Sequence, residues 1–168
     1  MPVHIRAADP TDIPGVRDIA RRTWAFAYRD LIPPGVQSDL VSRWYADEAL
    51  RGRMERGVLL VAESGTPPAL VGFVNLFRNN RVPGEVAVAA IYVLPEHERR
   101  GIGTALLREA LAGMPEARRL VASVERGNAG GLAFYNSRGF EVVGETMDEV
   151  AEGVTLPTVE VARSLPWD

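Results

Sequence analysis

A glycine-containing loop after an apolar run in the middle of the chain is the clearest candidate for chemistry. The charged segment Glu96–Arg100 leads into Gly101-Ile102-Gly103-Thr104, where a helix is predicted to begin. The first N–H groups of a helix lack partners within the helix, and the helix dipole adds positive potential there. Because glycine has no Cβ, a phosphate can approach this backbone closely. Arg99 and Arg100 add positive charge, so the loop is predicted to bind an anion.

This signal is weak when taken alone, because a G-x-G sequence at the start of a helix is more often structural. Two familiar phosphate motifs are excluded. Leu106 occupies the position of the third glycine in G-x-G-x-x-G, and the G-x-x-x-x-G-K-[ST] loop needs a lysine, which the chain lacks entirely.

Two longer sequence segments around and after this loop indicate what kind of protein contains it. "AAIYVLPEHERRGIGTALLREAL" followed by "VASVERGNAGGLAFYNSRGF" resembles the GNAT superfamily of N-acetyltransferases. The first string is similar to the part that binds the pyrophosphate of acetyl-CoA, and the second to the closing strand, asparagine and helix. The opening "IRAADPTDIPGV" also looks like that of many bacterial members.

The resemblance implies that acetyl-CoA is the cosubstrate, and it assigns roles to individual positions. The backbone of Ile91, Tyr92 and Val93 would pair with the pantetheine arm, and Asn128 would hydrogen-bond that arm or simply cap a helix. Tyr135 matches a tyrosine that lies beside the cofactor sulfur and can protonate it. The pyrophosphate would lie on the backbone of Arg99, Arg100, Gly101, Ile102, Gly103 and Thr104.

One position departs from the family pattern. Glu98 stands three residues before the first glycine, where family members usually have glutamine or arginine. A carboxylate beside a pyrophosphate is unfavourable unless it points away or pairs with Arg99 or Arg100. We therefore expect weaker cofactor binding rather than none, because the backbone forms most of the cradle.

Acetyl transfer to an amine also needs a proton acceptor. An alkyl amine with a pKa of about 10 is only about 0.1% neutral at pH 7. Some family members have a glutamate where this chain has Ser123, which cannot act as a base. Glu85 is the first candidate, because strict alternation along the strand would place it on the same face as Ile91 and Val93. Glu125 and Asp148 are more distant alternatives, and His97 is expected to be exposed.

The first helical region carries the candidates for the acceptor site. Trp24 and Tyr28 are predicted to bind the substrate, with Trp44 nearby, although aromatic residues there are more often part of the core. The predicted function is N-acetylation of a primary amine, on a small molecule or a protein, by direct attack in a ternary complex. The alternative is a catalytically quiet acyl-CoA-binding regulatory or interaction module.

The predicted elements that position these residues give an α+β fold, with a mixed, mostly antiparallel sheet of six or seven strands. The order is β-α-α-β-β-β-α-β-α-β-β, and a break is expected between the central strand and the strand Leu120–Val124. The predicted strands are Val3–Ala7, Val58–Glu63, Leu70–Phe77, Glu85–Leu94, Leu120–Val124, Phe140–Gly144 and Val154–Arg163. The predicted helices are Asp9–Tyr28, Val36–Arg56 (in one or two pieces), Gly101–Gly113 and Asn128–Arg138.

Composition sets the remaining expectations for residues 1–168, which are predicted to form a single domain. The chain has no cysteine and two histidines, so no metal site is expected. All 19 basic residues are arginine, and the net charge of −3 disfavours nucleic-acid and membrane partners. No apolar run is long enough for a signal peptide or a membrane span, which predicts the cytoplasm. A homodimer is expected through Val154–Arg163, taken as an open sheet edge.

Overall fold

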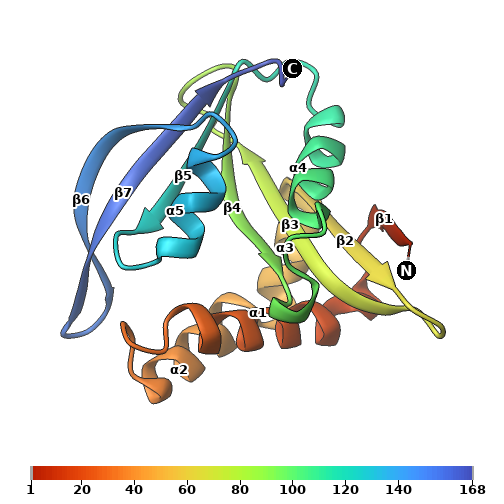
Figure 1. Cartoon of the computed structure of the whole chain (residues 1–168), viewed down its shortest axis with the longest axis horizontal. Coiled ribbons are helices and arrows are strands. Elements are labelled where there is room, and N and C mark those ends of the chain that lie inside the picture. The colour runs from red at the N-terminus through yellow and green to blue at the C-terminus, as the bar shows by residue number, and fades with distance from the viewer. Residues whose placement is uncertain (1, 168) are drawn as a thin grey trace.

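A seven-stranded mixed sheet organises the computed structural model, which describes residues 2–167 (Figure 1). The strand order is β1-β2-β3-β4-β5-β7-β6, and the only parallel neighbours among the described strands are β4 and β5. The predicted α+β class and number of strands are confirmed. The strands are β1 (Val3–Ala7), β2 (Val58–Ser64), β3 (Ala69–Arg78), β4 (Glu85–Val93), β5 (Arg119–Glu125), β6 (Glu141–Ala151) and β7 (Val154–Ser164).

The helices cover the two faces of this sheet. A 3-10 turn over Pro10–Asp12 precedes α1, and the Asp9 carboxylate caps it by accepting from the N–H of Thr11. Helices α1 to α3 pack on one face, whereas α4 and α5 pack on the other (Figure 1). The helices are α1 (Ile13–Ala27), α2 (Pro34–Trp44), α3 (Asp47–Arg56), α4 (Ile102–Ala112) and α5 (Ala129–Asn136).

Each face of the sheet has its own hydrophobic core. Leu106 and Leu107 of α4 are fully buried on one face together with Leu120 of β5. On the other face, Ile19 of α1 is buried with Phe73 of β3. Burial at about 25 cal/mol per Å² of apolar surface holds the helices against the sheet. A gap between β4 and β5 would therefore lie between the helical layer that contains α1 and the layer that contains α4, each with its own core.

Strand β4 has a bulge and then loses its neighbour on one side. Asn75 of β3 pairs with Ala90, but the next residue, Leu76, pairs with Val88, so Ala89 is the extra residue. On the other side, β4 pairs with β5 only over Glu85–Ala87. The expected break between these strands is confirmed, because from Val88 onward the edge of β4 that faces β5 is unpaired.

The C-terminal hairpin differs from the expectation. Strand β6 extends to Ala151 rather than ending near Gly144, because its acidic second half pairs with the first half of β7. Strand β7 is paired on both sides, with β5 and with β6. The prediction that Val154–Arg163 forms an open edge is therefore wrong. The edge strand at this end of the sheet is β6, which exposes Val142, Val143 and Met147.

Candidate active site

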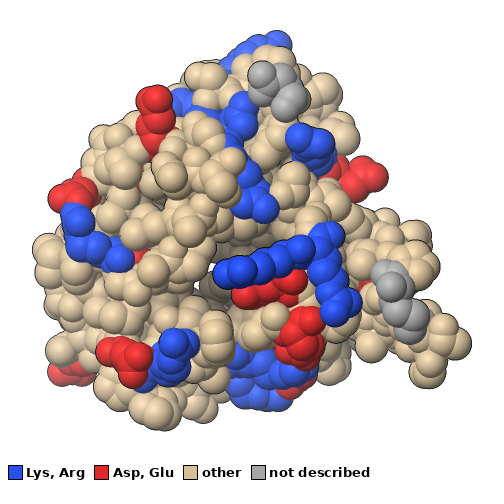
Figure 2. All heavy atoms as spheres, viewed as in Figure 1, with Lys and Arg blue, Asp and Glu red and all other residues tan. Residues whose placement is uncertain are grey.

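A cleft of about 780 Å³ opens where β4 and β5 diverge. Its walls come from the C-terminal part of α1, the second half of β4, the start of α4, the end of β5 and the length of α5. Figure 2 shows it as a hollow near the centre of this face, with arginine and acidic side chains along one rim. Eleven of the fourteen residues predicted to bind or react line this cleft; the other three are Glu85, Arg100 and Thr104.

The start of α4 has the geometry predicted for an anion site. Gly101 is the residue before the helix, and its φ of 79° lies in the left-handed region that glycine adopts most readily. Gly101, Ile102 and Gly103 all line the cleft. A Cβ on Gly103 would lie 2.8 Å from the Phe134 ring, so this glycine is required by the packing of α5 against α4. The absence of a side chain at Gly103 therefore allows α5 to pack on α4, in addition to the predicted access for a phosphate.

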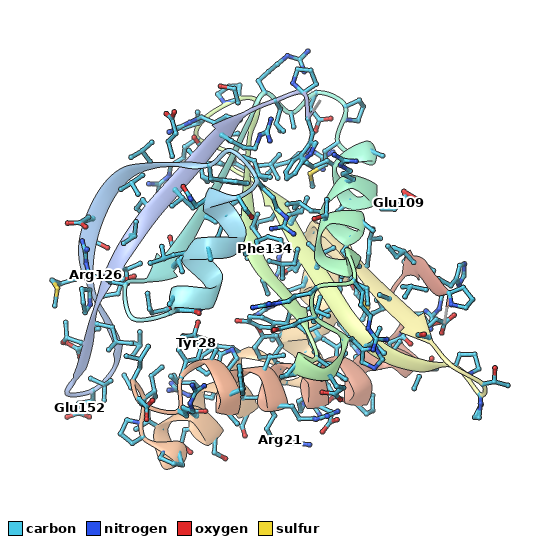
Figure 3. All side chains as sticks on the ribbon, in the orientation of Figure 1. Arg21, Tyr28, Glu109, Arg126, Phe134 and Glu152 are labelled. Atoms are coloured by element: carbon cyan, nitrogen blue, oxygen red, sulfur yellow. The ribbon has the colours of Figure 1, made fainter. Side chains whose placement is uncertain are left out.

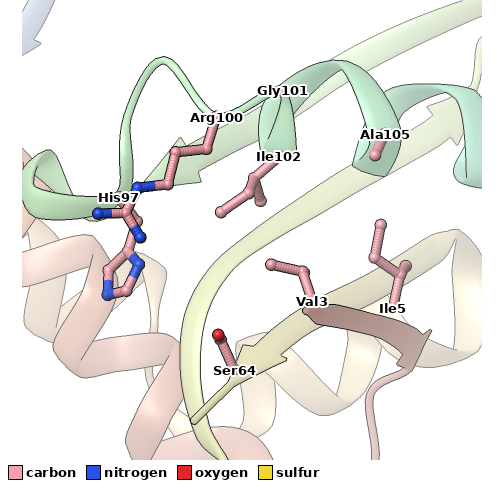
Figure 4. Close-up of a pocket in the computed structure, with 8 residues that line it drawn as sticks. All are labelled: Val3, Ile5, Ser64, His97, Arg100, Gly101, Ile102 and Ala105. Carbon is pink, nitrogen blue, oxygen red and sulfur yellow. The ribbon is translucent and has the colours of Figure 1, made fainter. Parts of the chain in front are cut away.

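The charged residues before α4 divide between two pockets. Arg99, with a φ of 63°, and Glu98 line the cleft. Arg100 instead lines a separate pocket of about 250 Å³ beside Val3 and His97 (Figure 4). Within residues 2–167 no ion pair joins Glu98 to either arginine. The structure thus brings Arg99 to the predicted cradle, whereas the Arg100 side chain extends toward His97 in the separate pocket (Figure 4).

Helix α5 contributes Asn128 and Tyr135 to the same cleft. The Asn128 side chain caps the helix, since its Oδ1 accepts from the N–H of Gly131 at 3.0 Å. The Tyr135 ring is buried between Phe134 and Phe140. No group of the described residues hydrogen-bonds its hydroxyl, which leaves that hydroxyl available to a ligand in the cleft. Burial, together with the nearby charge of Glu125, raises the pKa of Tyr135 above its ordinary value.

Tyr28 and Glu125 connect opposite walls of the cleft. The Tyr28 hydroxyl, at the end of α1, donates to Oε2 of Glu125, at the end of β5, at 2.8 Å. Figure 3 shows Tyr28 below α5, on the side of the cleft formed by α1. Burial and the Glu125 carboxylate raise the pKa of Tyr28, while a hydrogen bond with Asn128 lowers it. Glu125, Tyr28, Asn128 and Tyr135 therefore form one polar cluster, which we call the carboxylate cluster.

Trp24 and Tyr92 form the adjoining wall. The indole Nε1 of Trp24 donates to the Tyr92 hydroxyl at 2.9 Å, and the Trp24 ring packs edge-on against Tyr28. Both residues are largely buried and line the cleft, as do Ile91 and Val93. Trp24 and Tyr28 thus belong to the core and to the pocket wall at once, whereas Trp44 is 41% exposed and lies outside the cleft.

The structure does not bring Glu85 into the cleft. Glu85 lies at the closed end of the β4–β5 gap, where it accepts from Asn79 at 2.9 Å and pairs with Arg119 at 3.0 Å. The bulge at Ala89 also reverses the alternation of side chains along β4. Val86 and Val88 therefore share a core with Ile91 and Val93. The expectation that Glu85 shares a face with Ile91 and Val93 is wrong for this reason.

Ser123 lines the cleft and holds a carboxylate that sequence reasoning missed. Its hydroxyl is 2.7 and 2.9 Å from the two oxygens of Glu160, which lies directly across on β7. Cross-strand neighbours lie close together on one face of a sheet. No motif around Glu160 indicates this, because its place beside Ser123 depends on the register between β5 and β7.

Comparison with known proteins identifies the family. The family model "Acetyltransferase (GNAT) family" matches residues 16–140, which include most of α1, the cleft and α5. The chain belongs to the GNAT family of acetyltransferases. A probable N-acetyltransferase of Mycobacterium tuberculosis is 28% identical over 98% of this chain and 96% of its own length. A spermidine N(1)-acetyltransferase of Thermoplasma acidophilum is 25% identical over 84% of this chain and 90% of its own.

A solved structure shows the same fold with a cofactor bound. The PaiA N-acetyltransferase of Thermoplasma acidophilum, crystallised with coenzyme A, superposes with a TM-score of 0.80 at 22% identity. The match covers 98% of this chain and all of that one. The family match makes this GNAT chain an acyltransferase, and the cofactor that the same fold holds in the PaiA structure is coenzyme A. The cleft of this chain fits that molecule, since it has an unpaired strand edge beside a helix start with Gly101 in the left-handed region.

Among residues 2–167, no group of three or more histidine, aspartate or glutamate side chains could hold a metal ion. None of the helices within that range is both long and apolar enough to cross a membrane.

Proposed function

We propose that this GNAT protein acetylates a primary amine, on a small molecule or a protein, by direct attack in a ternary complex with acetyl-CoA. The observation that carries the proposal is the position of the carboxylate cluster. It lies in the same cleft as the start of α4, so that cofactor-binding and reactive groups face one space. The backbone of Ile91, Tyr92 and Val93 would hold the pantetheine arm along the unpaired edge of β4, with Asn128 opposite.

Acetyl-CoA supplies the acetyl thioester, and the residues of the chain manage the protons and the developing charge. A new C–N bond forms as the C–S bond breaks. Glu125 accepts the proton that the attacking amine loses, and Tyr135 donates a proton to the departing sulfur. Unpaired N–H groups of β4 beyond the bulge at Ala89 are suited to hold the negative charge that develops on the carbonyl oxygen.

Glu125 replaces Glu85 as the proposed base because of where each carboxylate lies. Glu125 lines the cleft beside Tyr135, whereas Glu85 is engaged by Arg119 at the closed end of the gap. The Tyr28 hydroxyl orients the Glu125 carboxylate by donating to one oxygen, which leaves the other oxygen for the amine.

Acidic groups at this end of the cleft favour a cationic acceptor. Asp30 and Glu125 line it, and Glu160 lies next to it through Ser123. The similarity to a spermidine N(1)-acetyltransferase supports the same class of cationic acceptor. We therefore place polyamines first among the acceptors to test. The cytoplasmic location and the homodimer predicted from the sequence stay predictions.

A screen of thiol release from acetyl-CoA over a panel of amines tests the proposal. The panel should include polyamines, amino sugars, amino acids and peptide N-termini, with mass spectrometry of the product. We expect acetylation of at least one primary amine and saturable dependence on both substrates. Ping-pong kinetics would contradict direct attack in a ternary complex. Binding of acetyl-CoA without turnover of any amine would instead support the quiet acyl-CoA-binding module.

A further inference from the structure

Arg138, in the turn after α5, is held rigidly beside the start of α4. Its guanidinium lies over the Phe134 ring, with Cζ 3.7 Å from the ring centre. Its Nη1 donates to the Phe134 carbonyl at 2.8 Å and to the Ser137 hydroxyl at 3.0 Å. These contacts fix the planar group before any ligand arrives, so little side-chain entropy remains to be lost on binding.

A third contact connects this arginine to the predicted cradle. Nε of Arg138 donates to Oγ1 of Thr104, in the first turn of α4, at 2.8 Å. Phe134, which the guanidinium covers, lies against Gly103 in the same turn. Arg138 also lines the cleft. The geometry therefore places a cation over the N-terminal turn whose N–H groups attract an anion.

The charge on Arg138 has no counter-ion among the residues that the structure describes. Among residues 2–167 it makes no ion pair with a carboxylate, and its Nη2 donates to no protein group. The side chain is half-buried, and burial lowers its pKa, which reflects the cost of holding the charge there. An anion in the cleft would remove that cost.

We infer that Arg138 binds the pyrophosphate of acetyl-CoA at the start of α4 and offsets the negative charge of Glu98. This inference rests on the function proposed above only because it needs acetyl-CoA to bind in the cleft. It does not depend on which amine is the acceptor. Arg138 would supply the positive charge that the sequence predicted for Arg100, whose side chain lies in the separate pocket lined by Val3 and His97 (Figure 4). The pyrophosphate is chosen over the 3′-phosphate of coenzyme A because Arg138 is tied to Thr104.

Calorimetry with coenzyme A and with dephospho-coenzyme A tests this inference. Arg138→Gln keeps a flat polar group but removes the charge, and we expect a roughly 10- to 100-fold weaker affinity for both ligands, as for loss of a charged hydrogen bond. Arg138→Lys, which keeps the positive charge, should lose less affinity than Arg138→Gln. Arg108→Gln, which makes the same change of charge on α4 outside the cleft, is the matched control and should bind as the wild type does.

The inference fails if Arg138→Gln weakens the binding of coenzyme A but not of dephospho-coenzyme A, because the arginine would then bind the 3′-phosphate. It also fails if Arg138→Gln binds both ligands normally. A purely structural role would lower the melting temperature without ligand and leave the salt dependence of binding unchanged, whereas a direct contact makes the wild type more sensitive to salt than the variant. Because calorimetry needs no acceptor, a failure of the amine screen would not alter this result.

Discussion

At the scale of single residues, the environment of Tyr135 sets its protonation state. Its ring is buried, and the neighbouring Glu125 carboxylate disfavours a phenolate, so the pKa of Tyr135 is raised. A group whose pKa is raised stays protonated as the pH increases toward that value. Tyr135 is therefore a proton donor throughout the neutral range, and it cannot serve as a base there.

Replacing Tyr135 with phenylalanine tests the proposed acid. The substitution removes one hydroxyl and keeps the ring between Phe134 and Phe140. We expect turnover to fall by roughly 10- to 1,000-fold, since a thiol is already a good leaving group. Affinity for coenzyme A and the melting temperature should barely change. Wild-type turnover on the true acceptor would show that the thiolate leaves without help.

Replacing Glu125 with glutamine tests the proposed base. Glutamine has the same shape and can still accept from the Tyr28 hydroxyl, but it cannot take a proton from the amine. We expect kcat/KM for the amine to fall by roughly 100- to 10,000-fold at neutral pH, with partial recovery at high pH where the amine is already neutral. A larger loss from Glu85→Gln than from Glu125→Gln would restore Glu85 as the base.

At the scale of the elements, one extra residue in β4 determines which side chains of this strand face the cleft. The bulge at Ala89 reverses which side chains face each core, and it coincides with the divergence of β4 from β5. The unpaired backbone edge that results is the place for a ligand that pairs like an added strand. Helix α4 begins at the open end of this gap because Gly101 permits the left-handed turn before it.

A substitution at Gly101 measures how much that turn depends on glycine. A Cβ there would meet nothing within 4 Å, so the cost of Gly101→Ala is conformational and should be about 1–2 kcal/mol of unfolding free energy. Gly35→Ala is the matched control, because Gly35 also has open space around it but lies in a helix with ordinary φ. The control should be neutral or slightly stabilising. Equal effects in chemical denaturation would contradict this explanation.

The junction between β1 and α1 predicts a dependence of stability on pH. Arg6 contacts both oxygens of the buried Asp12 carboxylate at 2.8 and 2.9 Å and thereby lowers the pKa of Asp12. A carboxyl group with a lowered pKa stabilises the fold above its unfolded pKa of about 3.9, and this contribution disappears as the pH falls below that value.

Asp12→Asn should cost about 1–3 kcal/mol at pH 7, because it removes the charge that Arg6 faces. Its unfolding free energy should also fall less than that of the wild type as the pH decreases from about 5 to 2. Urea denaturation at a series of pH values provides the measurement. Parallel curves for the two proteins would show that Asp12 does not contribute to the acid sensitivity.

At the scale of the whole molecule, the cleft lies between two hydrophobic cores that meet only through the sheet. One wall belongs to α1 and another to β5 and α5, and the Tyr28–Glu125 hydrogen bond joins the end of α1 to the end of β5. A ligand that fills the cleft contacts both layers, so its binding energy adds to the stability of the native molecule.

Acetyl-CoA should therefore raise the melting temperature. At a free concentration 100 times its Kd, linkage predicts about 2.7 kcal/mol of added stability. Differential scanning fluorimetry over a series of concentrations would show a continuous rise rather than a plateau. Arg138→Gln should need a higher concentration for the same shift. A melting temperature independent of acetyl-CoA would mean that the cleft does not hold it.

The sequence by itself determined the features that depend on neighbouring residues along the chain. The Asp9 cap, the start of α4 at Gly101 and the strand before it all follow from local propensity and from backbone groups left without partners. The family resemblance carried by these strings was correct as well.

Tertiary structure alone decided which side chains meet. The bulge at Ala89 separated Glu85 from the cleft, and the register of β5 with β7 set Glu160 beside Ser123. The packing of Phe134 on Gly103 brought Arg138 to Thr104. A shift of one residue in register moves every side chain of a strand to the other face, and no local pattern records that shift. Glu125, a distant alternative in the sequence, therefore became the proposed base only in the folded chain, and Arg138, which no motif indicated, became the residue proposed to bind the pyrophosphate.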